Sequence, residues 1–249
     1  MECVFFTTTR RAFSSCVTST IPEIGFQFSD VFIQKHGKRI FQWESELLRV
    51  HERRKKMFMK SQQKTAQCLW KLRSIFSRKG QVMVPIGSAV NGLGRGASDL
   101  DVVLITDQAD DLRSSFNIKF RKNERFRRAQ MGAVTKLLDT SGLARPGSVQ
   151  QLLFCSVPIV KFCSRDGVSV DLQFNNIGTI RSSLFVRTCV EANSVVPIII
   201  HWMNDFFDAV KLKDSRHGLF SSYNLNMLAI HFIQRSRAPS GPQDCNCQR

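Results

Sequence analysis

The fold is decided by residues 85–104, which read PIGSAVNGLGRGASDLDVVL. A short apolar run at 82–86 leads into this glycine-rich turn, and a second apolar run at 100–105 follows it. We expect both runs to be β-strands, because short apolar runs bounded by turn residues are typical of buried strands. Asp99 and Asp101 stand two apart on the second strand, so their carboxylates project from one face. A divalent cation such as Mg²⁺, which prefers oxygen ligands, would relieve their repulsion.

The turn before the acid pair has the composition of a phosphate-binding loop. Gly87 permits close backbone approach, and Gly87 with Ser88 can offer N–H groups and a hydroxyl to a triphosphate. Two metal ions for an in-line displacement need a third carboxylate, and Asp171 is the candidate, since it points away from the apolar face of the predicted strand 168–174. Singly, Asp99 could be a turn residue and Asp171 a solvated strand residue, but their coincidence with the turn favours a site.

The rest of the chain predicts an α/β core that lies between helical segments. Apolar residues recur at helical spacing over 30–78, and a second helix is predicted at 123–140. Beyond the sheet, the pattern is helical over 177–235. Three further strands are predicted, at 152–155, 158–163 and 168–174. Asp166-Gly167 predicts a hairpin turn between the last two.

The composition is that of a globular protein. Hydrophobic residues make up 43% and charged residues 22% of 249, which excludes a disordered or collagen-like chain. No apolar run approaches the roughly 18–20 residues that cross a bilayer, so no membrane span is predicted. The net charge is +16, and residues 1–80 hold 16 Lys and Arg against 6 Asp and Glu. This excess favours a polyanionic partner, nucleic acid or anionic membrane, although a solubilising surface explains it equally well.

The cysteines and the N-terminus bear on the compartment. Eight cysteines, scattered over a chain of this length, do not form a disulfide scaffold, and we expect the reduced thiols of an intracellular protein. Residues 1–20 contain Arg10, Arg11 and eight Ser or Thr, with Glu2 as their acid. A mitochondrial transit peptide has such a composition, and so does a flexible leader over 1–25. We expect the leader and a cytoplasmic location, with a mitochondrial location as the alternative.

Together, the Gly87-Ser88 turn, the Asp99-Leu100-Asp101 pair and Asp171 resemble the DNA polymerase β-type nucleotidyltransferase superfamily. More narrowly, the chain is similar to the cytoplasmic-type poly(A) polymerases and terminal uridylyltransferases, which act on RNA 3′ ends. Three further segments support the narrower resemblance: VPIVKF at 157–162, FNN at 174–176 and GLFSSY at 218–223.

The resemblance implies an α/β fold in two parts. Residues 26–176 would form a nucleotidyltransferase palm, a mixed sheet with flanking helices, together with N-terminal helices. Residues 177–235 would form an incomplete α-helical central domain of the poly(A) polymerase type. A flexible leader over 1–25 and a flexible tail over 236–249 would lie outside both parts. The family's loop that discriminates the nucleotide base is expected to be missing.

The resemblance also implies roles for single residues. Asp99, Asp101 and Asp171 would hold two Mg²⁺ (or Mn²⁺) ions, and Asp171 would help to deprotonate the RNA 3′-hydroxyl, which attacks the α-phosphate and displaces pyrophosphate. Five residues would bind the nucleotide: Gly87, Ser88 and Ser222 at the phosphates, Ser182 at the ribose and Tyr223 at the base. Outside the resemblance, Tyr223 could also be a core aromatic at the start of a helix.

Several positions depart from the family's pattern. Ile200 and Asn204 replace two triphosphate-binding lysines, a loss on the order of several kcal/mol, because charge-assisted contacts are worth about 1.5–3 kcal/mol each. Ser182-Ser183 replaces an Asn-Thr pair that touches the ribose. The segment after Trp202 is longer than usual, and its Lys211 and Lys213 could compensate for the lost lysines.

We therefore expect template-independent addition of ribonucleotides to RNA 3′ ends, AMP from ATP ahead of UMP from UTP. The partners would be an RNA 3′ end, ATP (or UTP) and an RNA-binding protein that chooses targets, with no membrane. The alternative is a catalytically inactive or truncated paralogue that binds RNA or a partner protein as a regulator. A third hypothesis, a generic basic α/β domain, leaves the acid spacing unexplained. The basic segment 119–128, with Phe120 and Phe126 among its charges, could guide RNA or be a solvated face.

Overall fold

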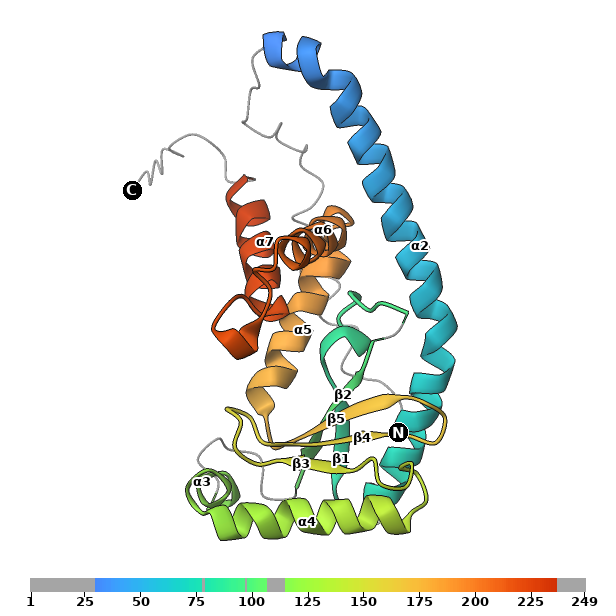
Figure 1. Cartoon of the computed structure of the whole chain (residues 1–249), viewed down its shortest axis with the longest axis vertical. Helices are drawn as coiled ribbons and strands as arrows, with labels where there is room; N and C mark the ends of the chain where they lie inside the picture. The colour runs from blue at the N-terminus through green and yellow to red at the C-terminus, as the bar shows by residue number, and fades with distance from the viewer. Residues whose placement is uncertain (1–29, 78, 97, 107–114, 237–249) are drawn as a thin grey trace, which may run out of the picture.

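The computed structural model describes residues 30–77, 79–96, 98–106 and 115–236 (Figure 1). The leader predicted at 1–25 and residues 237–249 of the predicted tail lie outside these ranges. The elements are α2 (Asp30–Ser77), β1 (Val82–Pro85), the 3₁₀ turn η1 (Gly87–Ala89), β2 (Leu100–Ile105), α3 (Ser115–Lys122), α4 (Glu124–Thr140), β3 (Gln150–Leu152), β4 (Ile159–Cys163), β5 (Ser169–Phe174), α5 (Ile177–Ala192), α6 (Val195–Ala209), the 3₁₀ turn η2 (Ser215–His217) and α7 (Ser222–Ser236).

Five strands form one mixed sheet in the order β1-β2-β5-β4-β3. Strands β2 and β5 run parallel, and the other neighbours pair antiparallel. The parallel register places Asp101 opposite Asp171, and the pairing of β4 with β5 places Lys161 opposite Asp171 on the other side. A mixed sheet with flanking helices confirms the fold class expected from the sequence.

The sheet buries one face against α3, α4 and the end of α2. Along β5 the buried side chains are Val170, Leu172 and Phe174, and Asp171 alternates with them on the less buried face, as the sequence predicted. Cys68, Leu72 and Phe76 of α2 are fully buried in the same cluster, as are Met131 and Leu138 of α4. Figure 1 shows α3 and α4 on one side of the sheet and α5, α6 and α7 on the other.

A second hydrophobic cluster lies among α5, α6 and α7. It contains Leu93 from the loop before β2, with Val186, Val196, Ile200, Ala229 and Ile230 from the three helices. Each side of the expected boundary at 176 thus has its own buried cluster, and the boundary itself stays a prediction. No single helix in the described ranges has the length and hydropathy to cross a bilayer. Helices α5 and α6 have that length and hydropathy only together, as a pair bent by 120°.

Helix α2 contacts both parts of the molecule: the first hydrophobic cluster through its last turns and helix α6 through its middle. Its last turns pack on the sheet, whereas its middle lies against α6, where the rings of Trp43 and Trp202 are 5.9 Å apart and those of His51 and His201 are 5.8 Å apart. With 48 residues, α2 is roughly 70 Å long, which explains how one helix spans both parts (Figure 1).

The structure differs from the sequence-based prediction at one strand and at one helix that was not predicted. The strand predicted at 152–155 is instead β3 at Gln150–Leu152, because its pairing with β4 ends where Leu152 meets Ile159, and the following residues turn back toward β4. Phe154, whose apolarity suggested the later position, is 78% exposed. Helix α3 was not predicted, and its residues 119–122 were expected only to belong to a basic segment. The hairpin turn at Gly167 is confirmed, with φ of 82°.

Candidate active site

Three acidic side chains and one lysine lie at neighbouring positions of β2, β5 and β4. Asp101 lies on β2 opposite Asp171 on β5, and Asp99 directly precedes β2. The Nζ of Lys161 on β4 lies 3.0 Å from Oδ1 of Asp171 and 3.5 Å from Oδ2 of Asp99. The structure therefore brings together the three acids that the sequence singled out, and adds a lysine whose position depends on strand register.

The acid cluster carries surplus negative charge. Burial raises the pKa of Asp101 to about 6, and the carboxylates of Asp171 and Asp99 add to the rise. Burial alone would lower the pKa of Lys161, but the carboxylates of Asp171 and Asp99 outweigh it and raise that pKa. Such mutual repulsion among neighbouring carboxylates, one of them partly buried, indicates a site that a further cation would stabilise.

The carboxylates fit a divalent cation in ligand type and charge, and only in part in geometry. Oδ1 of Asp171 is buried and accepts no hydrogen bond, since its 3.0 Å ion pair with Lys161 lacks hydrogen-bond geometry. Within the described ranges, no three His, Cys, Asp or Glu side chains are gathered closely enough to hold one ion. Asp101 and Asp171 offer the oxygen ligands that Mg²⁺ prefers, while the Lys161 ammonium supplies the positive charge in this arrangement.

The turn before β2 is held against Asp101 by the backbone. Ile86 N–H donates to the carbonyl oxygen of Asp101 at 2.9 Å, and Gly87 adopts φ of 63°. A Cβ on Gly87 would lie 2.8 Å from Oδ2 of Asp101, closer than Cβ atoms approach other atoms. Glycine is thus required at this position both for its conformation and for its lack of a side chain.

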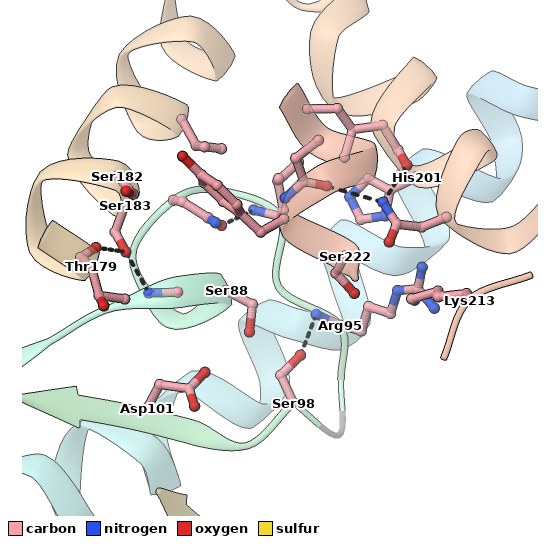
Figure 2. Close-up of a pocket in the computed structure, with 18 of the residues that line it drawn as sticks. Ser88, Arg95, Ser98, Asp101, Thr179, Ser182, Ser183, His201, Lys213 and Ser222 are labelled. Atoms are coloured by element: carbon pink, nitrogen blue, oxygen red, sulfur yellow. Dashed lines mark hydrogen bonds between the residues drawn. The ribbon is translucent and has the colours of Figure 1, made fainter. Parts of the chain in front are cut away.

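The Gly87 N–H group is already bonded within the protein. It donates to Oγ of Ser183 at 2.9 Å, and the Ser183 hydroxyl donates in turn to the carbonyl of Thr179 at 2.8 Å (Figure 2). Ser183 is 6% exposed, and its hydrogen bond with Gly87 connects α5 to the turn. This corrects the expectation that the Gly87 N–H is available to a triphosphate. In this turn Ser88 keeps its hydroxyl toward the cleft.

A cleft of about 650 Å³ lies between the turn, α5, α6 and the start of α7. Its lining includes the expected nucleotide-binding residues and one acid: Gly87, Ser88, Asp101, Ser182, Ser222 and Tyr223. Asp99 and Asp171 do not line it and lie beside it through their contacts with Lys161. Figure 2 shows Asp101 and Ser88 on one side of the cleft and His201 on the other.

Tyr223 and the two candidate serines occupy accessible positions. Tyr223 is the second residue of α7 and 49% exposed, so it is not a core aromatic. Ser222 begins the same helix. Ser182 is exposed on α5, where its hydroxyl donates to the carbonyl of Gly178 at 2.9 Å. All three lie at the surface of the cleft, where a nucleotide could contact them.

Helix α6 presents neutral side chains to the cleft. Ile200 belongs to the second hydrophobic cluster, and Asn204 is 5% exposed. The Asn204 amide donates to the carbonyl of Ile200 at 2.9 Å and to Oδ1 of Asn226 at 3.0 Å. His201 is buried between them, and burial lowers its pKa to about 4, so its ring is neutral at pH 7. Ile200 and Asn204, which replace the lysines of the family's pattern, therefore have structural contacts in this chain.

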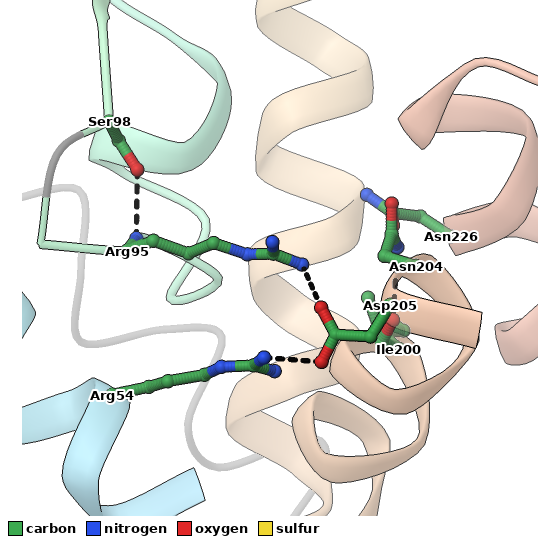
Figure 3. A network of polar contacts seen from close by, with 7 residues as sticks. All are labelled: Arg54, Arg95, Ser98, Ile200, Asn204, Asp205 and Asn226. Atoms are coloured by element: carbon green, nitrogen blue, oxygen red, sulfur yellow. Dashed lines mark hydrogen bonds and ion pairs between the residues drawn. The ribbon is translucent and has the colours of Figure 1, made fainter. Parts of the chain in front are cut away.

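Two residues of the cleft are cationic: Arg95, which had no role from sequence alone, and Lys213, which could compensate for the lost lysines. Arg95 donates from Nη2 to Oδ1 of Asp205 at 3.0 Å, and Arg54 of α2 pairs with the other oxygen of the same carboxylate (Figure 3). Lys213, in the loop after α6, lines the cleft, whereas Lys211 does not. Arg95 stands in the quoted turn, but its pairing with a residue 110 positions away leaves no local signal.

The basic segment 119–128 presents its charges without its aromatic rings. Phe120 is buried, with its ring 5.0 Å from that of Phe174, and Phe126 packs edge-on against Phe116 at 5.4 Å. The buried ring of Phe120 cannot stack on nucleic-acid bases, and the Phe126 ring is partly covered by Phe116. Two hypotheses for the segment stay open: contact between its lysines or arginines and an RNA backbone, or a solvated surface.

Comparison with known proteins identifies a matching family model and relatives of this chain. The sequence profile described as "Poly(A) RNA polymerase, mitochondrial-like, central palm domain" matches residues 44–191. Poly(A) RNA polymerase GLD2 of Danio rerio is 32% identical over 162 residues, which cover 63% of this chain and 29% of that protein. Protein HESO1 of Arabidopsis thaliana is 27% identical over 164 residues, covering 66% of this chain and 30% of that protein. The chain thus spans less than a third of the length of these relatives.

Solved structures share the fold. The non-canonical poly(A) polymerase complex GLD-2 – GLD-3 superposes with a TM-score of 0.60 at 19% identity, covering 76% of this chain and 58% of that one. A cytoplasmic RNA terminal U-transferase superposes with a TM-score of 0.59 at 18% identity, covering 75% and 51%. The complex of mtPAP with UTP gives 0.52 at 20% identity, covering 66% and 36%.

Proposed function

The chain belongs to the mitochondrial-like poly(A) RNA polymerase family through its central palm domain, and on this premise we propose that it adds ribonucleotides to RNA 3′ ends. AMP from ATP is the proposed addition, because curated relatives are named poly(A) RNA polymerases. UMP from UTP is the alternative, since a terminal U-transferase and a UTP complex have the same fold.

One observation carries this proposal: the pairing of Asp101 with Asp171 on parallel strands at the side of the cleft. The carboxylates of Asp101 and Asp171 repel each other, and Gly87 packs closely against Asp101. They form an acidic site beside a cleft of about 650 Å³, which is large enough for a nucleotide.

The residues of the chain divide the work of the reaction. Ser88 and Ser222 contact the phosphates, and Tyr223 stacks on the base, which orients the α-phosphate toward the acids. The Asp171 carboxylate accepts the proton of the RNA 3′-hydroxyl as that oxygen attacks the α-phosphate and pyrophosphate leaves. Lys161 holds Asp171 in place until that proton is transferred.

Asp101, Asp171 and Asp99 are the residues that would hold Mg²⁺ or Mn²⁺. Bound there, the ion supplies neutralisation of the charge that develops on the phosphate and on the leaving pyrophosphate. The pKa of Asp101 supports this assignment, because a raised pKa marks a carboxylate whose ionised form lacks a counter-ion.

RNA and a regulatory protein are the proposed partners, and the cytoplasm is the proposed location, with mitochondria as the alternative. GLD-2, which shares the fold, has been crystallised with RNP-8 and with GLD-3, and this supports a partner protein that supplies target choice. Among the described residues, Cys68, Cys155, Cys163 and Cys189 form no disulfide. Imaging of a tagged full chain in cells tests the location.

The test is extension of a labelled RNA oligonucleotide by the purified chain with each NTP and Mg²⁺. We expect a ladder with ATP that is lost in Asp101→Asn and in Asp171→Asn, while Asp139→Asn, an acid of α4 outside the site, extends RNA normally. Extension that persists in both active-site variants, or no extension by a folded wild-type chain, contradicts the proposal.

A second function has one observation in its favour. Because α6 presents Ile200 and Asn204 instead of cations, a non-catalytic chain that binds RNA or a partner protein as a regulator is the alternative. A folded wild-type chain that binds the RNA oligonucleotide without extending it, under the conditions above, supports this alternative.

A further inference from the structure

The positive charge of the cleft comes from residues outside α6. Among the described residues that line it, Arg95 and Lys213 are the side chains that are cationic at neutral pH. Arg95 belongs to the glycine-rich turn and Lys213 to the loop after α6, so two separate loops bring these charges together. Figure 2 shows them next to each other, on the opposite side of the cleft from Asp101.

Arg95 is fixed in position and keeps donors free. Its backbone N–H donates to Oγ of Ser98 at 2.8 Å, and its Nη2 donates to Asp205 at 3.0 Å (Figure 3). Arg54 pairs with the second oxygen of Asp205, so two guanidinium groups share one carboxylate and a positive charge is left over. The remaining N–H groups of Arg95 can therefore donate to an anion in the cleft.

Lys213 adds a second charge without an ion pair of its own. Within the described ranges, no carboxylate lies within 4 Å of its ammonium, and Asp205 and Asp208 act on it only from farther away. Its partial burial and the neighbouring Arg95 both disfavour the charged form. Two neighbouring cations in a partly buried position indicate a place where an anion is bound.

We propose that Arg95 and Lys213 bind the triphosphate of the nucleotide, in place of the lysines that would stand at Ile200 and Asn204. The inference rests on the proposed function and names the phosphate subsite of the same cleft. A nucleotide polyphosphate is favoured over the RNA backbone because the hydroxyl of Ser222 and the ring of Tyr223 line the same cleft.

The experiment measures equilibrium binding of ATP, of inorganic tripolyphosphate and of an RNA oligonucleotide to the full chain with Mg²⁺. Arg95→Ala and Lys213→Met should each weaken binding of ATP and tripolyphosphate about ten-fold or more, because charge-assisted contacts are lost. Binding of the RNA oligonucleotide should stay within about two-fold.

Two matched controls separate this role from general effects of charge. Arg54→Ala removes the other arginine that pairs with Asp205, and Arg54 does not line the cleft. Lys211→Met removes a lysine that is two residues from Lys213 and lies outside the cleft. Both should bind ATP within about two-fold of wild type. Equal losses in Arg54→Ala and Arg95→Ala would show that the ion-pair network acts through stability, and would overturn the assignment.

The outcomes distinguish this inference from the proposed function. RNA extension with an unchanged KM for ATP in Arg95→Ala and Lys213→Met overturns the inference and leaves the function standing. Selective loss of ATP binding in a chain that does not extend RNA supports the inference and contradicts the function. A loss confined to RNA binding assigns these residues to the RNA backbone and overturns the inference, as does a wild-type chain that binds neither ATP nor tripolyphosphate.

Discussion

Gly87 and Asp101 are packed so closely that a single added carbon on Gly87 would stand 2.8 Å from Oδ2 of Asp101. The hydrogen bond from Ile86 N–H to the Asp101 carbonyl oxygen keeps the turn at this distance. The position of the Asp101 carboxylate therefore depends on the absence of a side chain at Gly87, in the turn before β2.

Gly87→Ala should displace the Asp101 carboxylate and lower the rate of RNA extension at least ten-fold, because small displacements of reacting groups have large effects on rate. Gly147→Ala is the matched control, since Gly147 has a similar φ of 72° and no atom within 4 Å of its added carbon. Both variants should lose about 1 kcal/mol of stability through backbone strain. Equal extension rates would show that contact with Asp101 is unimportant.

Asp101→Asn should stabilise the metal-free protein at neutral pH. The folded-state pKa of about 6 is above the usual value of 3.8, so the stability present below pH 3.8 is lost as the pH rises through 6. The neutral amide avoids this loss and should gain on the order of 2 kcal/mol at pH 7.5. Chemical denaturation with EDTA at pH 7.5 and pH 4 measures the difference, which should nearly vanish at pH 4.

His201 should make the fold sensitive to acid. Its folded-state pKa of about 4 is below the usual value of 6.5, so the stability present above pH 6.5 is lost as the pH falls toward 4. Relative to wild type, His201→Gln should therefore gain on the order of 3 kcal/mol between pH 7 and pH 4. His231→Gln, at an exposed position of α7, is the control in the same denaturation series and should follow wild type.

Asn204 should contribute to stability through its buried amide pair. Asn204→Ala leaves the Oδ1 of Asn226 without its donor, and such an unpaired buried group costs about 1–3 kcal/mol. The double variant Asn204→Ala/Asn226→Ala should lose less than the sum of its two single variants, because neither amide is then left unpaired. Additive losses in a double-mutant cycle would mean that the two amides act independently.

Periodicity in the sequence predicted the elements whose burial is regular. The alternation in 168–174 gave β5 correctly because one face of that strand is buried throughout. The strand predicted around Phe154 was misplaced, since an apolar side chain can stay at the surface while Gln150 and Gln151 pair with β4. Local pattern alone cannot distinguish these cases.

The site was predictable where its residues are close in sequence or match a motif, as with Asp99, Asp101 and the Gly87 turn. Relations between distant segments were not predictable. The bond from Gly87 to Ser183 joins residues 96 positions apart, and the contact of Lys161 with Asp171 depends on strand register. The charge shared by Arg95 and Asp205 has the same cause, since it joins a turn to a helix.

Helix α2 has a mechanical consequence for the cleft. It is anchored to α6 at Arg54 and to the sheet from Cys68 onward, and the segment between these anchors is about four turns, or roughly 20 Å, of unbroken helix. Any hinge rotation that separates the sheet from α6 has to bend this rod or break the Arg54 ion pair. We therefore expect those four turns to resist widening of the cleft, together with the Arg54 ion pair and the contact between His51 and His201.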